Sequence, residues 1–349
     1  MATNGDILIL QSQDDVQRAI HYEVNPKELP LGEGGTGIVR HGVMVDKKSG
    51  VRKDVAIKFL YSDLTENVIQ RSKREAEIHI VHENLVEMLD FVQVGNSDLY
   101  GNGSVHYHVV SELLCGVMLL DLLNSAVPDD IYEKYPKIKE FNELLLNDRV
   151  SFALTIIRGV LSGIMALHDN GYIHRDIDPS NIMITHEGKI KLIDLGICKR
   201  LGNMNNTNEN LTSVGQFVGK ASYAAPELVR GDLANQNETT DIYAIGIMLY
   251  QIILGKLPFQ GSMNEVLDKQ ITSKMPVKNI QNKQIRELVK KATEKKQEDR
   301  YQTAAEFRVA IDSIQYGDEI VDKELPIVPL TVAAVVVGAI VGIGLAFLI

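Results

Sequence analysis

The pattern of apolar and polar positions changes about half-way along the chain. Residues 22–60, 85–94 and 105–114 carry short runs of β-branched residues, and glycines interrupt the first stretch, which is typical of strands and turns. Residues 62–81 have a helical pattern instead. After residue 148 the apolar positions recur at helical spacing in three long segments, which are residues 151–171, 241–255 and 282–296. A strand-rich part followed by a helix-rich part predicts an α+β fold with two unequal lobes.

The last residues of the chain form an apolar run without a charged side chain, IVPLTVAAVVVGAIVGIGLAFLI, at positions 327–349. As a helix at about 1.5 Å per residue, this run would span about 35 Å, more than the roughly 30 Å of a hydrocarbon core. We expect a transmembrane helix here and not a buried core helix, because a core helix of this length seldom lacks a polar face. Gly338 and Gly342 are spaced so that two such helices can approach closely, which makes a homodimer one expectation.

This apolar run determines the expected domain layout. Residues 1–20 are an N-terminal extension, and they contain no basic segment followed by an apolar run that would indicate a secretory signal. Residues 21–315 form the folded domain, residues 316–326 a polar linker, and residues 327–349 the membrane helix. Residues 203–219 are polar and rich in Asn, Thr and Ser, and a loop this long within a compact domain is expected to be functional or disordered.

Composition narrows the class of protein. The chain has 349 residues, of which 45% are apolar and 23% are charged, and these fractions exclude a disordered or collagen-like chain. The formal net charge of −10 argues against binding of nucleic acid through bulk electrostatics, which needs a cationic surface. The two cysteines, Cys115 and Cys198, lie far apart and have no metal-binding spacing, so we expect the folded domain to lie in a reducing cytosol.

A glycine-rich segment, LGEGGTGIV, lies among the first predicted strands. Its residues Gly32, Gly34 and Gly37 allow backbone N–H groups to approach a phosphate closely. The segment alone is also compatible with an ordinary turn or with a dinucleotide-binding fingerprint, but that fingerprint requires a helix directly afterwards. More strand follows here, so a hairpin that covers phosphates is favoured. Further along, the strand pattern of VAIK places Ala56 and Lys58 on one face.

Two segments in the second half carry residues suited to a divalent cation and a proton. HRDIDPSN spans His174–Asn181 and DLG spans Asp194–Gly196, and both adjoin short apolar strands. The side chains of Asp176, Asn181 and Asp194 offer hard oxygen donors, which Mg²⁺ prefers.

Taken in order along the chain, these motifs resemble those of the eukaryotic-type (Hanks-type) serine/threonine protein kinases, and in particular the bacterial, membrane-anchored members. The resemblance extends from about His21 to Ile314 and includes the segments AAPE, DIYAIGIMLYQIILGKLPF and KATEKKQEDRYQTAAEF. Kinases of this family transfer the γ-phosphate of Mg-ATP to a protein hydroxyl. The resemblance therefore implies a bilobal fold, with a strand-rich N-lobe over about 21–111 and a helical C-lobe over about 113–315.

The family resemblance also implies roles for the matching residues, with ATP and Mg²⁺ as the ligands. ATP would contact the glycine-rich segment, the neighbouring strands, the following helix, the hinge between the lobes and one C-lobe strand, through Leu31, Gly32, Gly34, Gly37, Val39, Ala56, Lys58, Glu75, Glu112, Leu114 and Met183. Asn181 and Asp194 would hold Mg²⁺. The catalytic residues would be Asp176, which accepts the proton of the substrate hydroxyl, and Lys58. We expect Lys220 to be catalytic as well, at a position where the chain departs from the family.

The residue that pairs with Lys58 is open between two glutamates. Glu75 is preferred, because REA at this place resembles the family pattern, and Glu77 is the alternative, because the helix is shorter than usual. The hinge would bind the adenine edge through backbone groups of Glu112 and Leu114.

Other charges resemble structural positions of the family. Glu227 is expected to pair with Arg300, and Asp241 is expected to hold the backbone of the catalytic loop. The polar loop before Glu227 is expected to be controlled by phosphorylation, with Thr212 or Ser213 as the preferred sites.

Two positions depart from the family pattern. Asp178 stands where these kinases usually have lysine, and Lys220 stands where they usually have threonine. In the family, these two side chains meet beside the catalytic aspartate. A lone change of lysine to aspartate would argue for lost activity, but Lys220 returns the positive charge from the opposite wall. A compensating swap is therefore the preferred interpretation, and independent drift of the two positions toward a pseudokinase is the alternative.

The expected function is phosphorylation of serine or threonine in proteins, by a cytoplasmic kinase domain attached to the inner cell membrane through a single span. One rival is a membrane-tethered pseudokinase scaffold, which the intact Lys58, Asp176, Asn181 and Asp194 argue against. A second rival is a small-molecule phosphotransferase. The AAPE segment with its matching Arg300 argues against it, because the related small-molecule enzymes lack that substrate platform.

Overall fold

The computed structural model of the chain describes four stretches, which are residues 2–4, 7–97, 103–201 and 220–314. The chain divides into two compact units, Met1–Ser313 and Ile314–Ile349, and the first contains all of the described helices and strands. The predicted membrane helix at 327–349 and the predicted phosphorylation sites Thr212 and Ser213 lie outside the described residues.

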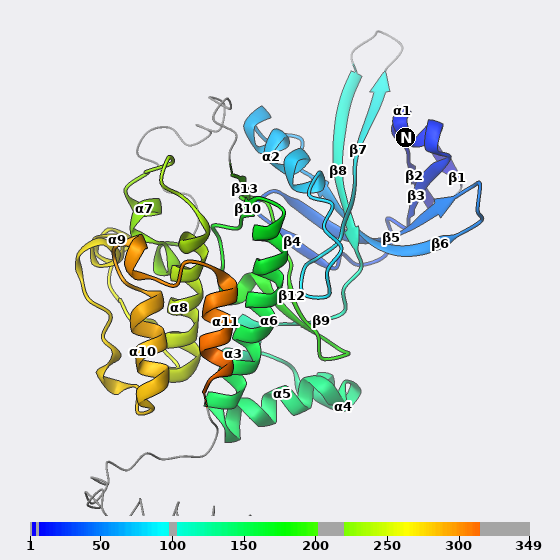
Figure 1. The fold of residues 1–349 in the computed structure, drawn as a ribbon. Helices are drawn as coiled ribbons and strands as arrows, with labels where there is room; N and C mark the ends of the chain where they lie inside the picture. Colours follow the sequence, from blue (N-terminus) through cyan, green and yellow to red (C-terminus); the bar gives the residue numbers. More distant parts are fainter. Residues whose placement is uncertain (1, 5–6, 98–102, 202–219, 315–349) are drawn as a thin grey trace, which may run out of the picture. The chain divides into compact units, whose positions relative to one another are not determined.

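The first part of this unit is an eight-stranded antiparallel sheet (Figure 1). Neighbouring strands pair in the order β1-β2-β3-β5-β6-β8-β7, and β4 pairs with β5 off this path. The strands are β1 (Ala2–Asn4), β2 (Ile7–Leu10), β3 (Ile20–Val24), β4 (Gly32–Gly34), β5 (Gly37–Asp46), β6 (Arg52–Leu60), β7 (Met88–Ser97) and β8 (Gly103–Glu112). Helix α2 (Glu66–Ala76) packs against β7 and β8.

The alternation that predicted β6 is present in its packing. Val55 and Ile57 are fully buried in the core of the sheet, together with Tyr22, whereas Ala56 and Lys58 lie half-buried on the opposite face. The period of two along a strand puts these residues on opposite faces, so one face of β6 builds the core and the other is available to a ligand.

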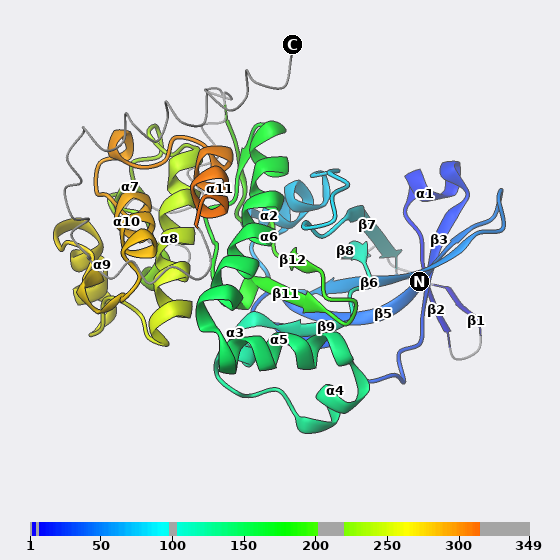
Figure 2. The same cartoon turned by 60° about the horizontal axis from the view of Figure 1, so that its bottom comes forward.

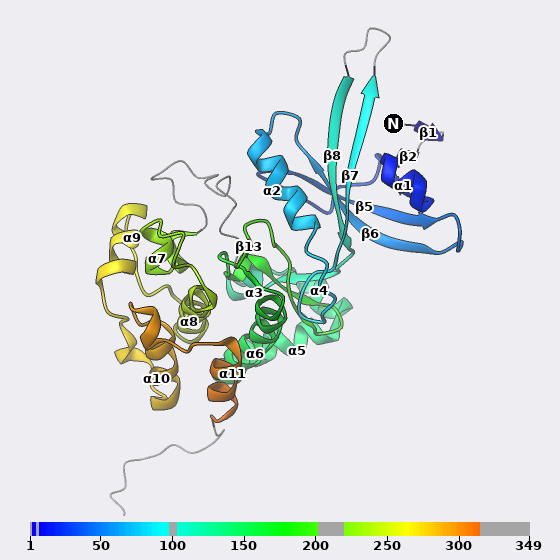
Figure 3. The same cartoon turned by 45° about the horizontal axis from the view of Figure 1, so that its top comes forward.

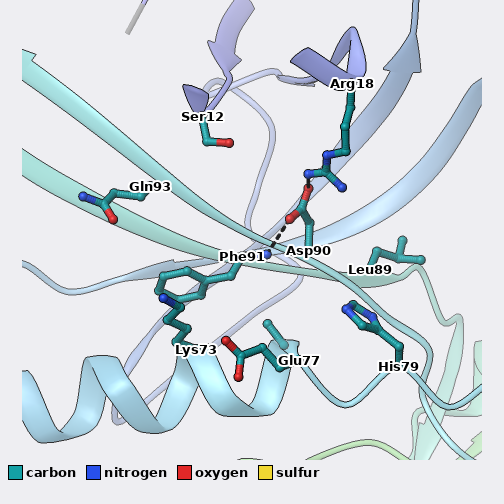
Figure 4. Close-up of a pocket in the computed structure, with 10 residues that line it drawn as sticks. Ser12, Arg18, Lys73, Glu77, His79, Leu89, Asp90, Phe91 and Gln93 are labelled. Carbon is teal, nitrogen blue, oxygen red and sulfur yellow. Dashed lines mark hydrogen bonds and ion pairs between the residues drawn. The ribbon is translucent and has the colours of Figure 1, made fainter. Parts of the chain in front are cut away.

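Residues 2–4 and 7–10 of the predicted N-terminal extension form strands of the same sheet. Strand β2 pairs with β3, and Leu10 is fully buried in the sheet core. Helix α1 (Gln13–Arg18) follows, and Arg18 forms an ion pair with Asp90 on β7 (Figure 4). The sheet thus extends into the predicted N-terminal extension, and Leu10 of β2 contributes to its core.

The second part of the unit is mostly helical (Figure 1). Its helices are α3 (Leu119–Leu123), α4 (Asp129–Lys134), α5 (Pro136–Asn147), α6 (Arg149–Asp169), α7 (Pro226–Val229), α8 (Glu238–Leu254), α9 (Met263–Thr272), α10 (Lys283–Ala292) and α11 (Ala304–Asp312). The three long predicted helices correspond to α6, α8 and α10. Helices α6 and α8 pack against each other and are buried over most of their length, so they form the centre of this part.

Short strands flank the connection between the two parts (Figure 2). They are β9 (Gly116–Met118), β10 (Tyr172–Ile173), β11 (Ile182–Thr185), β12 (Ile190–Leu192) and β13 (Lys199–Arg200). Strands β12, β11 and β9 form one sheet, and β10 pairs with β13. HRDIDPSN lies between β10 and β11, and DLG lies between β12 and β13. Each motif therefore connects the two small sheets, and the flanking strands fix both of its ends.

Among the described residues, α6 is the one helix that is both long enough and apolar enough to cross a membrane. Its residues Phe152, Ile156, Val160 and Ile164 are fully buried among the other elements of the helical part. The apolar character of α6 is therefore explained by its place in the domain core.

Candidate active site

The glycine-rich segment forms the hairpin β4–β5, as its sequence predicts. Gly32 pairs with Val39 and Gly34 with Gly37. A Cβ atom at Gly32 or Gly34 would meet no described atom within 4 Å, so the hairpin presents bare backbone on that side. At Gly37 a Cβ atom would overlap the main-chain oxygen of Phe59, which leaves room for glycine alone. The hairpin therefore has the open backbone that close contact with a phosphate requires.

The half-buried face of the sheet continues from this hairpin. Val39 lies opposite Lys58 on the paired strands β5 and β6, and Ala56 lies opposite Ser111 on β8. The N–H group of Leu31 donates a hydrogen bond to the carbonyl oxygen of Val39 at 2.9 Å. These contacts put the predicted nucleotide-binding residues of three strands on one continuous surface.

Of the two candidate glutamates on α2 and its end, Glu75 is buried and Glu77 is exposed. Burial raises the pKa of Glu75 to about 7, with a further contribution from the charge of Asp194, while the charge of Lys58 acts in the opposite direction. The N–H group of Leu195 donates a hydrogen bond to Glu75. The described residues contain no ion pair between Glu75 and Lys58, so these side chains interact over a longer distance than the resemblance implies.

The predicted hinge has one backbone donor in use and one free. The N–H group of Glu112 donates to the carbonyl oxygen of Glu87 at 2.9 Å, and the Glu112 side chain accepts a hydrogen bond from buried Lys191. No described residue accepts a hydrogen bond from the N–H group of Leu114. Met183 on β11 is half-buried. The free donor of Leu114 suits the edge of a purine base, whereas the N–H group of Glu112 is already satisfied.

The catalytic loop is held by a buried carboxylate on α8. Asp241 accepts hydrogen bonds from the N–H groups of His174 and Arg175, both at 2.8 Å, and lies 2.8 Å from Nε2 of His168. Burial alone would raise the pKa of Asp241, but the hydrogen bond and charge of His168 and the charge of His174 keep this pKa below its ordinary value. Arg175 has a φ of +69°, a left-handed conformation that these bonds hold in place. His168 has no sequence signal for this role beyond its position in the last turn of α6.

The residues expected to meet a cation and a proton lie together at the end of this loop. The side-chain amide of Asn181 donates to the main-chain oxygen of Asp176 at 2.8 Å and to its Oδ2 at 3.2 Å. Burial raises the pKa of Asp176, the charges of Asp178 and Asp194 raise it further, and His174 lowers it. The accumulated negative charge is an environment that a bound cation would relieve.

The donor set fits Mg²⁺, provided that other ligands come from outside the chain. Within the described residues, no three or more His, Cys, Asp or Glu side chains are grouped so that they hold a metal ion. Asn181 and Asp194 offer one amide and one carboxylate. Mg²⁺ is commonly bound in this way, through one or two protein oxygens together with phosphate oxygens and water.

The two positions that depart from the family pattern are in direct contact. Nζ of Lys220 donates to Oδ1 of Asp178 at 2.6 Å and also to Oγ of Ser180. Asp178 is buried, whereas 46% of the Lys220 side chain is exposed. Oδ2 of Asp178 has no hydrogen-bond partner among the described residues. Lys220 thus forms an ion pair with the buried Asp178 and offsets its negative charge.

The expected pair of Glu227 and Arg300 is present and fully buried. Two parallel hydrogen bonds of 2.9 and 3.0 Å join the guanidinium group to the carboxylate, and the Thr240 hydroxyl donates a third bond at 2.9 Å. Burial on its own would raise the pKa of Glu227, but Arg300 holds it below its ordinary value. This pair ties α7 to the segment before α11.

Comparison with known proteins agrees with this geometry. Residues 26–308 match the family model of the protein kinase domain. The chain is 30% identical over 284 residues to the serine/threonine-protein kinase PrkC of Bacillus subtilis, an alignment that covers 79% of this chain and 38% of the relative. It is 29% identical over 296 residues to the serine/threonine-protein kinase PknB of Mycolicibacterium smegmatis, which covers 82% of this chain and 42% of the relative. The chain therefore spans less than half the length of these curated relatives.

Proposed function

Because the chain belongs to the protein kinase domain family, we propose that it transfers the γ-phosphate of Mg-ATP to serine or threonine hydroxyl groups of proteins. One observation carries this proposal most strongly: Asp176 and Asn181 are in contact, and the charge of Asp194 acts on Asp176, at the end of a loop anchored by Asp241. Relatives that are named serine/threonine-protein kinases support the choice of acceptor.

In the proposed reaction, Asp176 has the role of the base. Its carboxylate orients the acceptor hydroxyl for in-line attack and takes up the proton as the new O–P bond forms. The hydrogen bond from Asn181 fixes the orientation of this carboxylate. The pKa of Asp176 is raised, which moves it toward the working pH and makes its carboxylate a better acceptor for the hydroxyl proton.

The phosphates are positioned by the remaining site residues. We assign the backbone of Gly32, Gly34 and Gly37 and the ammonium of Lys58 to the phosphates, and the free N–H group of Leu114 to the adenine edge. When bound by Asn181 and Asp194, Mg²⁺ would neutralise charge on the phosphate oxygens. The larger list of nucleotide contacts predicted from the sequence remains part of this proposal.

Lys220 completes the site from the opposite wall. Its ammonium is held by Asp178 and Ser180, and 46% of its side chain is still exposed. We assign it the stabilisation of charge that develops on the transferred phosphoryl group, because a preorganised cation is most effective where charge develops. Asp178 then acts through Lys220 by fixing its position.

We also propose that residues 327–349 anchor the kinase domain to a membrane, with the domain in the cytoplasm, and that Gly338 and Gly342 permit contact between two such helices. The uncharged apolar run supports the anchor. Fractionation of cells tests it: the full chain should require detergent for extraction, and recovery in the soluble pool without detergent contradicts the anchor.

A transfer assay tests the proposed function. The full chain in detergent is incubated with γ-labelled ATP, Mg²⁺ and a mixture of peptides in which one serine or threonine is flanked by random residues. We expect Mg²⁺-dependent label on serine or threonine, its loss in Asp176→Asn, and no loss in the matched control Asp169→Asn, which alters an exposed aspartate. Nucleotide binding without transfer in the wild type would show that the fold is kept without the chemistry.

A further inference from the structure

The turn that follows Lys220 is held by a side chain from a distant helix. This turn, η3 (Ala221–Tyr223), packs against α9. The side-chain amide of Gln270 on α9 donates hydrogen bonds to the main-chain oxygens of Ala221 at 3.2 Å and of Ser222 at 2.7 Å. Gln270 is fully buried, whereas Ala221 and Ser222 are half-buried, so both bonds are partly shielded from water.

The orientation of the Gln270 amide is itself determined by its neighbours. Lys295 Nζ donates to the hydroxyl oxygen of Tyr243 at 2.7 Å, and this hydroxyl lies 2.7 Å from Oε1 of Gln270. An ammonium group can only donate, so the Tyr243 hydroxyl accepts from Lys295 and directs its own proton at Oε1. The Gln270 NH₂ group must then face the two carbonyl oxygens of the turn.

Lys295 also holds the backbone of the same helix. Its ammonium donates to the main-chain oxygen of Gln270 at 2.7 Å and lies 5.1 Å from the ring centre of Tyr243 and 5.2 Å from that of Phe259. The described residues contain no ion pair between Lys295 and a carboxylate. The ammonium is thus held by the Tyr243 hydroxyl, by the main-chain oxygen of Gln270 and by the faces of two rings. Its position is therefore fixed, and it orients the hydrogen bonds from Tyr243 to Gln270 and on to the turn.

The turn connects this buried network to the catalytic loop. On one side of it, Lys220 binds Asp178 and Ser180; on its other side, the Tyr223 hydroxyl donates to Gln251 on α8. Helices α7 and α9 lie beside each other at this end of the helical part (Figure 3). Within the described residues, no hydrogen bond of this network reaches the predicted nucleotide-binding residues of the sheet, so displacement of the turn should weaken binding of the acceptor more than binding of ATP. Because Lys220 directly precedes the turn, displacement should also lower kcat.

We propose that Gln270 is a positioning residue for the protein substrate: by holding the main chain of Ala221 and Ser222, it fixes the surface on which the acceptor polypeptide lies beside Asp176. This inference rests on the proposed function, because it presumes a protein acceptor. It also assigns Tyr243 and Lys295 to the orientation of the Gln270 amide.

The test measures KM for the peptide and KM for ATP separately in the full chain. The acceptor is the best peptide from the transfer assay. Gln270→Glu keeps the size of the side chain and its acceptor for Tyr243, but it replaces the two donated hydrogen bonds by repulsion between oxygens. Loss of these two partly buried bonds should raise KM for the peptide by about tenfold. The KM for ATP and the affinity for a fluorescent ATP analogue should stay within about twofold, because no hydrogen bond of the network in the described part of the chain reaches the nucleotide-binding residues of the sheet.

Gln302 provides the matched control. Its amide also donates to main-chain oxygens, those of Gln297, Glu298 and Arg300, but it is exposed. Gln302→Glu should leave both Michaelis constants unchanged. Tyr243→Phe removes only the hydroxyl that orients the amide, and it should raise KM for the peptide in the same direction by about threefold.

Two outcomes would overturn the inference: an unchanged KM for the peptide in folded Gln270→Glu, or a parallel rise of both Michaelis constants, which would indicate general loosening. If Gln270→Glu does not fold, Gln270→Met removes the same two donors without adding charge and is held to the same outcomes. A wild type that binds the ATP analogue but phosphorylates no peptide would instead contradict the proposed function.

Discussion

Buried carboxylates have opposite surroundings in the helical part and at the predicted active site. Asp241 and Glu227, which support the helical part, accept hydrogen bonds from groups of the chain itself, and their pKa values are held below the ordinary range. Glu75 and Asp176, at the predicted active site, have few donors, and burial raises their pKa values. The chain itself thus neutralises the carboxylates of the helical part, whereas Glu75 and Asp176 accept fewer hydrogen bonds and lie near further carboxylates.

This difference distinguishes structural from chemical roles. A carboxylate that is neutralised by a group of the protein itself supports the folded state without any ligand. A carboxylate that the protein leaves beside others of its kind costs stability, and such groups gather where a cation, a proton or a phosphate enters. The charges of the predicted active site are therefore balanced only when its ligands bind, whereas Glu227 and Arg300 balance each other within the chain.

The largest effect is expected from a substitution at Asp176, which should abolish activity without loss of stability. Asp176→Asn removes the base and should lower phosphoryl transfer by about 100-fold to 10 000-fold. The midpoint of thermal unfolding without ligands should stay constant or rise, because one of several neighbouring negative charges is gone. Transfer assays and calorimetry on the same preparation check this, and a variant that is both destabilised and active would break the comparison.

The opposite result is expected for the structural pair. Arg300→Met leaves the carboxylate of Glu227 buried without its cation, which should lower the free energy of unfolding by about 3–5 kcal/mol. The double variant Glu227→Gln with Arg300→Met should recover part of this loss, since no unpaired charge remains. Urea unfolding measures both, and a loss below about 1 kcal/mol in the single variant would mean that the pair is not the support described here.

Glu75 sharpens the comparison through its pH dependence. Its pKa is about 7 in the folded protein, against an ordinary value of 4.5. The folded state therefore prefers protonated Glu75, so this contribution to stability is complete below about pH 4.5 and is lost as pH rises through about 7. The full loss is about 3 kcal/mol at 1.36 kcal/mol per pKa unit.

The measurement is the difference between wild type and Glu75→Gln in the free energy of unfolding at pH 5 and pH 8, without nucleotide. Glu75→Gln should be the less pH-dependent of the two, whereas Glu77→Gln, in which the altered residue is exposed, should follow the wild type. Equal pH dependence in all three proteins would show that Glu75 ionises at its ordinary pKa in the folded state.

Much of the fold was predictable because it is reflected in the hydrophobic periodicity of short segments and in the order of the motifs along the chain. The change of hydrophobic period marked the sheet and the helices, and the spacing in VAIK placed Ala56 and Lys58 on one face. The pair of Glu227 with Arg300, and the contact of Asp241 with the catalytic loop, followed from the order of motifs that resembles the kinase family.

Other features depended on distances that no local pattern records. Strand β2 is only four residues long, so its place in the sheet core had no periodic signal. The choice between Glu75 and Glu77, and the absence of an ion pair to Lys58, depend on how α2 packs on the sheet. Gln270 was not predicted, because its partners are main-chain atoms far along the sequence, and any residue type could supply them.

The central claim is that the catalytic loop and its surroundings form an active phosphotransfer site in which the charge of Lys220 offsets that of Asp178. A double-mutant cycle on turnover tests it most directly. We predict that Lys220→Ala lowers kcat more than Asp178→Ala does, because it leaves the buried carboxylate unopposed beside Asp176. The double variant Asp178→Ala with Lys220→Ala closes the cycle and should give a coupling energy of about 1–3 kcal/mol. Separately, Asp178→Lys combined with Lys220→Thr should recover much of the activity. Simple additivity of the two single changes would contradict the claim and would identify Asp178 as a step toward a pseudokinase.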